Sequence, residues 1–156
     1  MHLPAALVRK LHDVHDDAEP WLARLPETMA RLESAWHLRI TGLVPQLSYH
    51  LVAYAEQVDE NGTCTPCILK LCPPSDELVR EGEALSYYAG DGISRLLGRD
   101  DEVSAMLLER VLPGVSLQEL WTANEDEGHT RVTAELMRRL WRPVREPGPF
   151  RPLQRW

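Results

Sequence analysis

The sequence CILKLC (residues 67–72) carries a single cation, Lys70, within an otherwise apolar run. Apolar residues on both sides of the alternation are typical of an inner strand that is buried on both faces. Lysine is seldom buried unless an anionic group lies beside it. The run therefore predicts an inner strand whose lysine needs a carboxylate partner.

A helix directly after this strand supplies a suitable partner. Pro73 and Pro74 end the strand, Ser75 suits a helix cap, and the pattern predicts a helix over residues 76–88. Glu81 falls on its apolar stripe, three or four residues from the apolar side chains before and after it. We therefore predict an ion pair between Lys70 and Glu81. The alternative is an ordinary surface pair on an edge strand.

Further strand-like runs flank this strand and helix. Residues 47–58 precede it, and the turn between them contains Asn61-Gly62, a pair that favours a tight hairpin. Residues 93–97 and 103–111 form a second predicted hairpin, with the polar turn at 98–101. With one helix inside the sheet and others on both sides, the pattern indicates an α+β fold with four or five antiparallel strands.

Helical patterns occupy both ends of the chain. Apolar residues recur at helical steps over residues 19–38, where Pro26 predicts two helices or a kink. Ser116 and Glu119 have capping-box spacing for a short helix, and a longer one is expected from about Glu125 to Trp141, with solvated basic residues at its end. We divide the chain into a helical segment (1–40), a sheet region (41–114), later helices (115–142) and a proline-rich linker or tail (143–156).

Composition narrows the class of protein. The net charge of -7 argues against nucleic acid or an anionic membrane as partner, and we expect a cytoplasmic protein because apolar runs fall short of the ~20 residues that a membrane helix needs. The cysteines Cys64, Cys67 and Cys72 fit reduced thiols at a strand edge. A zinc site is the less favoured reading, because a second pair of ligands does not follow.

Six blocks, in order along the chain, resemble a known family. They are LSYHLV (47–52), ILKL (68–71), REGEAL (80–85), GISRLL (92–97), LLERVLPG (107–114) and LMRRLWRP (136–143). Their order and spacing resemble the first half of the aminoglycoside/hydroxyurea resistance kinases, which include streptomycin 6-phosphotransferases. The resemblance implies a protein-kinase-like amino-terminal lobe that binds ATP, with about five antiparallel strands and one intervening helix.

The resemblance also implies roles for particular residues. Lys70 would contact the α- and β-phosphates of ATP, and Glu81 would hold Lys70 in place. Ile68 shares the strand face of Lys70 and would roof the adenine pocket. The segment from Glu109 to Val111 would be the hinge that offers backbone groups to the adenine edge.

The loop over the phosphates would be the segment that contains Ser48, Tyr49 and His50. It lacks the glycine pattern of protein kinases, so these residues would act through backbone and hydroxyl donors. The favoured alternative for His50 is a partly exposed turn histidine without a catalytic duty. The same alternative applies to Ser48.

The residues that transfer the phosphoryl group are expected elsewhere. The family places its catalytic aspartate and its magnesium ligands in a second lobe, and no corresponding His-Gly-Asp loop follows the hinge here. We therefore expect a truncated kinase lobe that is inactive alone and meets an aminoglycoside only together with a second lobe. The alternative is a non-catalytic nucleotide-binding or interaction module. An exposed lobe face also predicts self-association.

Overall fold

A computed structural model describes residues 3–45, 49–120 and 126–143, and these residues form an α+β fold. Their antiparallel strands make one sheet of five, in the order β1-β2-β3-β5-β4, as the sequence predicted. The elements are α1 (Ala5–Val14), α2 (Ala18–Trp36), β1 (Leu38–Leu43), β2 (Leu51–Val58), β3 (Cys64–Leu71), α3 (Asp76–Tyr88), β4 (Leu96–Asp100), β5 (Ala105–Glu109), α4 (Leu117–Leu120) and α5 (Asp126–Leu140).

The strand with the buried cation lies at the centre of the sheet. β3 pairs with β2 on one side and with β5 on the other, which confirms the prediction of an inner strand. Lys70 lies opposite Val52 of β2 and Met106 of β5. Directly opposite residues point to the same side of a sheet, so these three side chains share one face.

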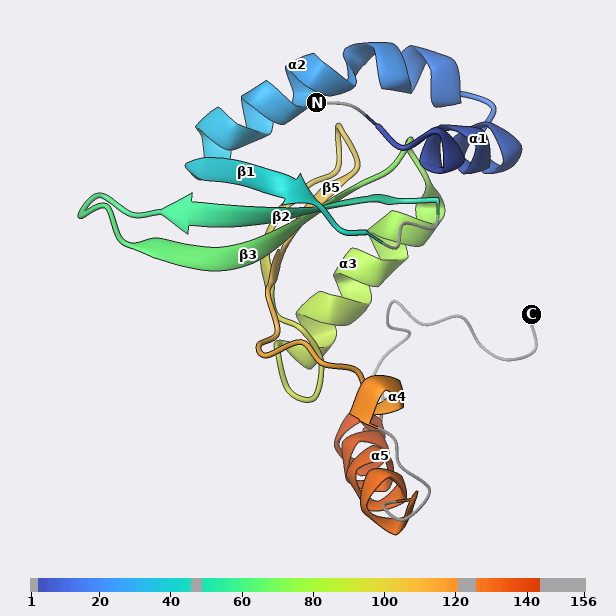
Figure 1. Ribbon diagram of the computed structural model, residues 1–156, viewed down its shortest axis with the longest axis vertical. Helices are drawn as coiled ribbons and strands as arrows, with labels where there is room; N and C mark the ends of the chain where they lie inside the picture. The colour runs from blue at the N-terminus through green and yellow to red at the C-terminus, as the bar shows by residue number, and fades with distance from the viewer. Residues whose placement is uncertain (1–2, 46–48, 121–125, 144–156) are drawn as a thin grey trace.

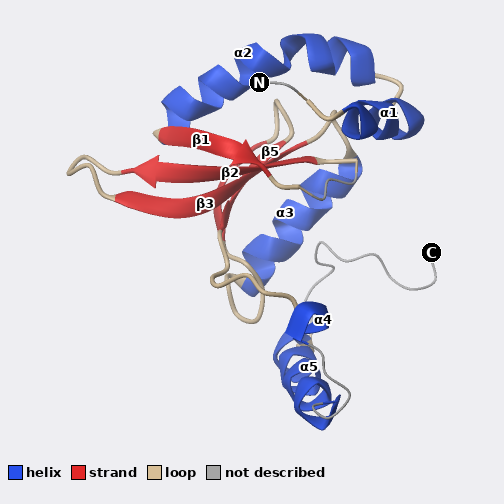
Figure 2. Cartoon of the chain, viewed as in Figure 1, coloured by secondary structure: helices blue, strands red, loops and turns tan. Residues whose placement is uncertain are grey.

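Helices cover the two faces of the sheet unequally (Figure 1). The α2 face carries the larger core, in which α1 and α2 pack on alternate residues of the central strands, including Ala53, Leu69 and Leu107. The α3 face carries Lys70 and a smaller cluster, in which Leu78 and Leu85 of α3 pack against Met106. Figure 2 shows α2 and α3 on opposite sides of the strands. Successive residues of the central strands therefore point alternately to the α2 face, which holds the larger core, and to the α3 face, which holds the charged pair.

Several boundaries differ from the sequence prediction. Residues 38–40 belong to strand β1, because α2 ends at Trp36 and His37 adopts a left-handed conformation. Pro26 lies inside a single helix and does not divide it. The expected turn at residues 98–101 is largely strand β4, and the chain turns at residues 101–104. Gly98 falls in the strand beside a register shift, where an added Cβ would lie 3.4 Å from the ring of Trp36.

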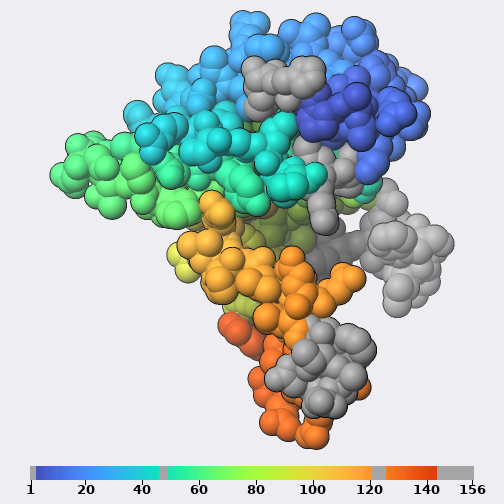
Figure 3. All heavy atoms as spheres, viewed as in Figure 1, coloured from blue at the N-terminus to red at the C-terminus, as the bar shows by residue number. Residues whose placement is uncertain are grey.

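The segment after β5 extends away from the sheet (Figure 3). Ser116 and Glu119 form the predicted capping box, in which the Ser116 backbone N–H donates to Glu119 and the Glu119 N–H donates to the Ser116 hydroxyl. The prediction that the basic end of α5 is merely solvated is wrong, because Arg139 and Arg142 bind Asp91. None of the helices within the described ranges is long and apolar enough to cross a bilayer.

Candidate functional site

Lys70 and Glu81 form the ion pair that the sequence predicted. The Nζ atom of Lys70 lies 2.7 Å from Oε1 and 2.6 Å from Oε2 of Glu81, so the ammonium donates to both carboxylate oxygens. The Lys70 side chain is 15% exposed and that of Glu81 34% exposed. The pair is shielded enough to be held in one geometry and open enough for an anionic ligand to approach.

Local sequence explains where α3 places Glu81. The Ser75 hydroxyl accepts a hydrogen bond from the Leu78 backbone N–H and so caps the first turn. Leu78 and Leu85, on either side of Glu81, are buried against the sheet, which aims the stripe between them at β3. Glu81 is therefore directed at Lys70 by the same periodicity that buries its apolar neighbours.

The loop before β2 is joined to α3 at its exposed start. The Tyr49 hydroxyl donates to Oε1 of Glu77 at 3.0 Å, and this hydrogen bond raises the pKa of Tyr49. Ser48, also expected in this loop, lies outside the described residues. Tyr49 thus connects the segment expected over the phosphates to the helix that carries Glu81. The sequence could not reveal this contact, because it joins positions 28 residues apart.

His50 is buried, which corrects the expectation of a partly exposed turn histidine. It is 6% exposed and directly precedes Leu51, the first residue of the core strand β2. Its Nε2 atom is enclosed and has no hydrogen-bond partner among the described residues. Burial, and after it the charge of Lys70, lowers the pKa of His50, so the uncharged imidazole is favoured at neutral pH.

The α3 face beside Lys70 is mainly apolar. Ile68 lies opposite Tyr54 of β2 and Leu108 of β5, so these three side chains continue the face on which Lys70 stands. The guanidinium of Arg110 lies 4.3 Å from the centre of the Tyr54 ring. An apolar surface that leads to a paired lysine suits a flat aromatic group joined to an anion. The sequence prediction did not place Tyr54 and Arg110 on this face. The alternation of side chains along the two strands would have indicated that position.

Part of the expected hinge already forms hydrogen bonds within the protein. The Glu109 backbone N–H donates to the Arg95 carbonyl at 2.8 Å, and its own carbonyl accepts from the Ser94 hydroxyl at 2.7 Å. The Glu109 carboxylate accepts from the Arg95 N–H. Val111 is 61% exposed. The structure thus uses Glu109 to fasten the end of β5 to the loop before β4, and it leaves Val111 at the surface.

The cysteines do not form a common cluster. Cys64 is exposed at the start of β3, whereas Cys67 and Cys72 are buried. Burial raises the pKa of the Cys67 and Cys72 thiols, which favours their uncharged form. Within the ranges that the structure describes, no three His, Cys, Asp or Glu residues gather as metal ligands would.

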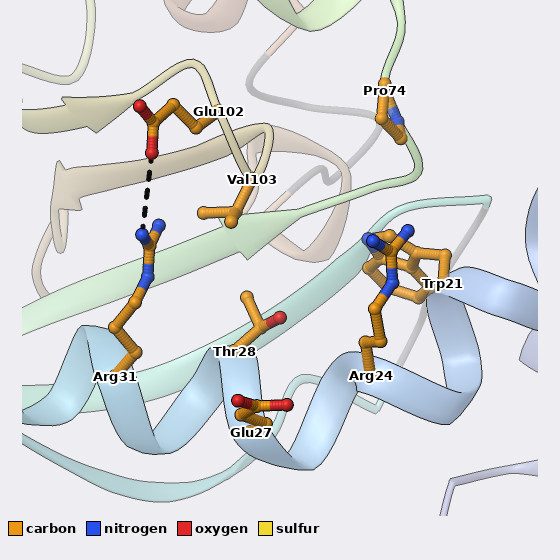
Figure 4. Close-up of a pocket in the computed structure, with 8 residues that line it drawn as sticks. All are labelled: Trp21, Arg24, Glu27, Thr28, Arg31, Pro74, Glu102 and Val103. Atoms are coloured by element: carbon orange, nitrogen blue, oxygen red, sulfur yellow. Dashed lines mark ion pairs between the residues drawn. The ribbon is translucent and has the colours of Figure 1, made fainter.

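A separate pocket of about 260 Å³ lies beside α2, lined by Trp21, Arg24, Glu27, Thr28, Arg31, Pro74, Glu102 and Val103. Figure 4 shows Arg31 extending toward Glu102, and their charged groups lie 3.6 Å apart. Arg31 also binds Asp100 at 2.6 Å. None of the residues expected to bind nucleotide lines this pocket. It lies between α2 and the β4–β5 turn.

Comparisons with known proteins agree with this geometry. Residues 35–156 match the model of the family described as aminoglycoside/hydroxyurea antibiotic resistance kinase. A streptomycin 6-kinase from Streptomyces griseus is 32% identical over 149 residues, which are 95% of this chain and 46% of that protein. A streptomycin 6-kinase from Streptomyces glaucescens is 30% identical over 125 residues, 80% of this chain and 38% of the relative.

The chain spans less than half the length of each of these two relatives. The comparison with solved structures found no match. The family match nevertheless covers most of the chain and includes β2, β3 and α3, which build the charged pair. The protein therefore belongs to the aminoglycoside/hydroxyurea antibiotic resistance kinase family.

Proposed function

We propose that this chain is the ATP-binding lobe of an aminoglycoside O-phosphotransferase of the streptomycin type. The observation that carries the proposal is the shielded ion pair of Lys70 and Glu81 on the α3 face. A lysine held by a helix carboxylate is the arrangement that kinases use to grip the α- and β-phosphates of a nucleotide. The names of the two relatives support streptomycin as the class of acceptor.

The neighbouring residues fit the remaining parts of a nucleotide. In this proposal Ile68 covers the adenine, and the segment from Glu109 to Val111 follows its edge, with the exposed Val111 contributing backbone groups. Ser48, Tyr49 and His50 approach the phosphates from the loop before β2. The Tyr49–Glu77 hydrogen bond supports this placement, because it ties that loop to the helix of Glu81.

Magnesium does not fit the residues at hand. Kinases hold it on the phosphates with Asp and Asn side chains. Glu81 beside Lys70 is already engaged by the ammonium, and within the described ranges no three His, Cys, Asp or Glu residues gather as metal ligands would. We propose that the magnesium ligands and the catalytic aspartate belong to residues that this chain does not contain. Incubation of the chain with Mg-ATP and streptomycin should then yield no phosphorylated product. Stoichiometric product in a mass spectrum would contradict this part of the proposal.

Thermal unfolding with and without ATP tests the binding role. A ligand that binds only the native state raises its stability, by about 2.7 kcal/mol at a hundredfold excess over the dissociation constant. The chain should therefore melt at a higher temperature in ATP, and Lys70→Ala should abolish most of the increase. Arg39→Ala is the matched control, because Arg39 is a strand cation paired with Glu56 in the same sheet. An equal ATP response in both variants would contradict the proposal.

A further inference from the structure

A group of contacts joins the end of α3 to the end of α5. Asp91, just beyond α3, accepts from Nε of Arg139 at 3.0 Å and from its Nη2 at 2.6 Å, and it also pairs with Arg142. These arginines hold the pKa of Asp91 below its ordinary value. The Asp91 carboxylate is thus charged at neutral pH. It binds Arg139 in the last turn of α5 and Arg142, which follows the end of the helix.

The two tyrosines at the end of α3 reach the same place. The Tyr88 hydroxyl donates to the Leu140 carbonyl at 3.0 Å, and the Tyr87 hydroxyl donates to the Pro143 carbonyl at 3.3 Å. The guanidinium of Arg142 lies 5.6 Å from the centre of the Tyr88 ring. The Tyr88 hydroxyl therefore binds a carbonyl at the end of α5, where a helix leaves acceptors without helical partners, and the Tyr87 hydroxyl binds a carbonyl beyond that end.

The backbone between α3 and β4 is shaped to let α5 approach. Gly92 has a φ of +81°, which L side chains rarely adopt. A Cβ added there would lie 3.2 Å from the Leu136 side chain and 3.3 Å from that of Leu140. We name the contacts of Tyr88, Asp91 and Gly92 with α5 the α3–α5 latch.

Both helices depend on few other contacts. α5 has no buried residue among those described, and besides the latch it faces the short helix α4. α3 buries Leu78, Gly82 and Leu85 on a face of the sheet whose apolar cluster is small. Glu81 lies seven residues before Tyr88, about two helical turns away. A helix is stiff over two turns, so a shift at its latched end also moves Glu81 relative to β3.

We propose that Asp91 and Tyr88 are positioning residues, which set α3 through the α3–α5 latch so that Glu81 holds Lys70 ready for the nucleotide phosphates. The inference rests on the proposed ATP-binding role of Lys70. It adds that α5 and the residues after it, through their contacts with the end of α3, influence how Lys70 binds the phosphates. Neither Asp91 nor Tyr88 touches the nucleotide in this arrangement.

Chemical labelling of lysine tests the mechanical part without any nucleotide. The chain has two lysines, Lys10 and Lys70, so mass spectrometry after brief acetylation reports Lys70 against Lys10 as an internal reference. The Lys70 side chain is 15% exposed and its ammonium donates two hydrogen bonds to Glu81, which restricts the approach of the reagent. Asp91→Ala should raise the labelling of Lys70 relative to Lys10 by about threefold or more. Glu127→Ala, which breaks an acid–arginine pair within α5, is the matched control and should leave the ratio unchanged.

Nucleotide titration tests the functional part. Asp91→Ala should weaken ATP binding about threefold to tenfold and leave adenosine binding unchanged, because adenosine lacks the phosphates. Asp91→Glu should restore much of the ATP affinity. In a Lys70→Ala background, Asp91→Ala should cause no further loss, since both changes then act through one contact.

The outcomes separate this inference from the proposed function. If the unaltered chain binds ATP no better than Lys70→Ala does, the proposed function fails and the inference fails with it. If ATP binding depends on Lys70 but Asp91→Ala changes neither labelling nor affinity, the inference alone is overturned. An equal loss of ATP and adenosine affinity also overturns it, since that result indicates general damage. Should Asp91→Ala not fold by circular dichroism, Tyr88→Phe, which removes one hydroxyl, must give the same pattern at smaller amplitude.

Discussion

The two faces of the sheet are built by different means. On the α2 face, sixteen buried hydrophobic residues form one core with α1 and α2, whereas on the α3 face the corresponding cluster among the described residues has four. The α3 face instead carries the Lys70–Glu81 pair and lies beside the buried His50. The difference indicates that one side of the sheet supplies most of the core and that the other carries the proposed nucleotide contacts. Changes on the two sides should therefore have separable effects.

The largest loss of stability should come from the α2 face. Leu69 is fully buried in β3, one residue from Lys70 and on the opposite side of the sheet. Leu69→Ala should reduce the free energy of unfolding by about 2–5 kcal/mol, because it removes packed atoms and leaves a cavity. Urea unfolding followed by circular dichroism measures this loss. A loss below about 1 kcal/mol would mean that the core is less tightly packed than the burial indicates.

Lys70→Ala should give the reverse result on the α3 face. Glu81 is 34% exposed and can be hydrated once its partner is gone, so the free energy of unfolding should fall by only about 1 kcal/mol or less. Affinity for ATP should fall by at least about tenfold, since the proposed charged contact with the phosphates would be lost. Urea unfolding and calorimetric titration measure the two quantities. A large stability loss would show that the pair also supports the fold.

His50 predicts a pH dependence that belongs to the α3 side. Its pKa is lowered in the folded protein, so the unfolded chain binds a proton first as the pH falls. The contribution of His50 to the free energy of unfolding is complete at a pH above its pKa in the unfolded chain, near 6.5. It is lost as the pH falls from there to the lower pKa of the folded protein, and the free energy changes by at most about 1.4 kcal/mol per pH unit. His50→Gln should flatten the stability profile in this window. An unchanged profile would mean that another group titrates there.

Arg39→Ala should have the smallest effect. Arg39 binds Glu56 between the edge strand β1 and β2, and its side chain is 65% exposed. Solvent screens such a pair, so the urea midpoint should not change measurably, and ATP affinity should also stay constant. The comparison with Lys70 is direct, because each residue is a strand cation paired with a glutamate. A marked effect of Arg39→Ala on ATP binding would place part of the nucleotide site at the β1 edge.

The sequence could predict those features that arise from local periodicity. Alternation around Lys70 gave the central strand, and the helical steps around Glu81 gave its direction, so their pairing could be inferred across a short connection. The strand β1 was assigned partly to the preceding helix, because the six residues of Leu38–Leu43 include a glycine and carry no strong alternation. Gly98 was interpreted as a turn although it lies in a strand, beside a register shift between β4 and β5.

Contacts between distant segments could not be predicted. Asp91 binds arginines 48 and 51 residues later, and no pattern in one sequence connects these positions. The burial of His50 likewise depends on how the loop before β2 folds against the core, which the residue types alone do not determine. Assignment of the family came from the order of several short blocks. Gly92, Arg139 and Arg142 fall within those blocks, but the contacts that form the latch emerged only from the structure.

Calorimetric titration of ATP and adenosine into the unaltered chain and into Lys70→Ala tests the central claim most directly. The two ligands share the base and sugar and differ in the phosphates that Lys70 is proposed to hold. We expect ATP to bind the unaltered chain more tightly than adenosine and this advantage to disappear in Lys70→Ala, while adenosine binds both proteins equally. An ATP advantage that survives the loss of Lys70 would contradict the claim that this ion pair forms the phosphate site.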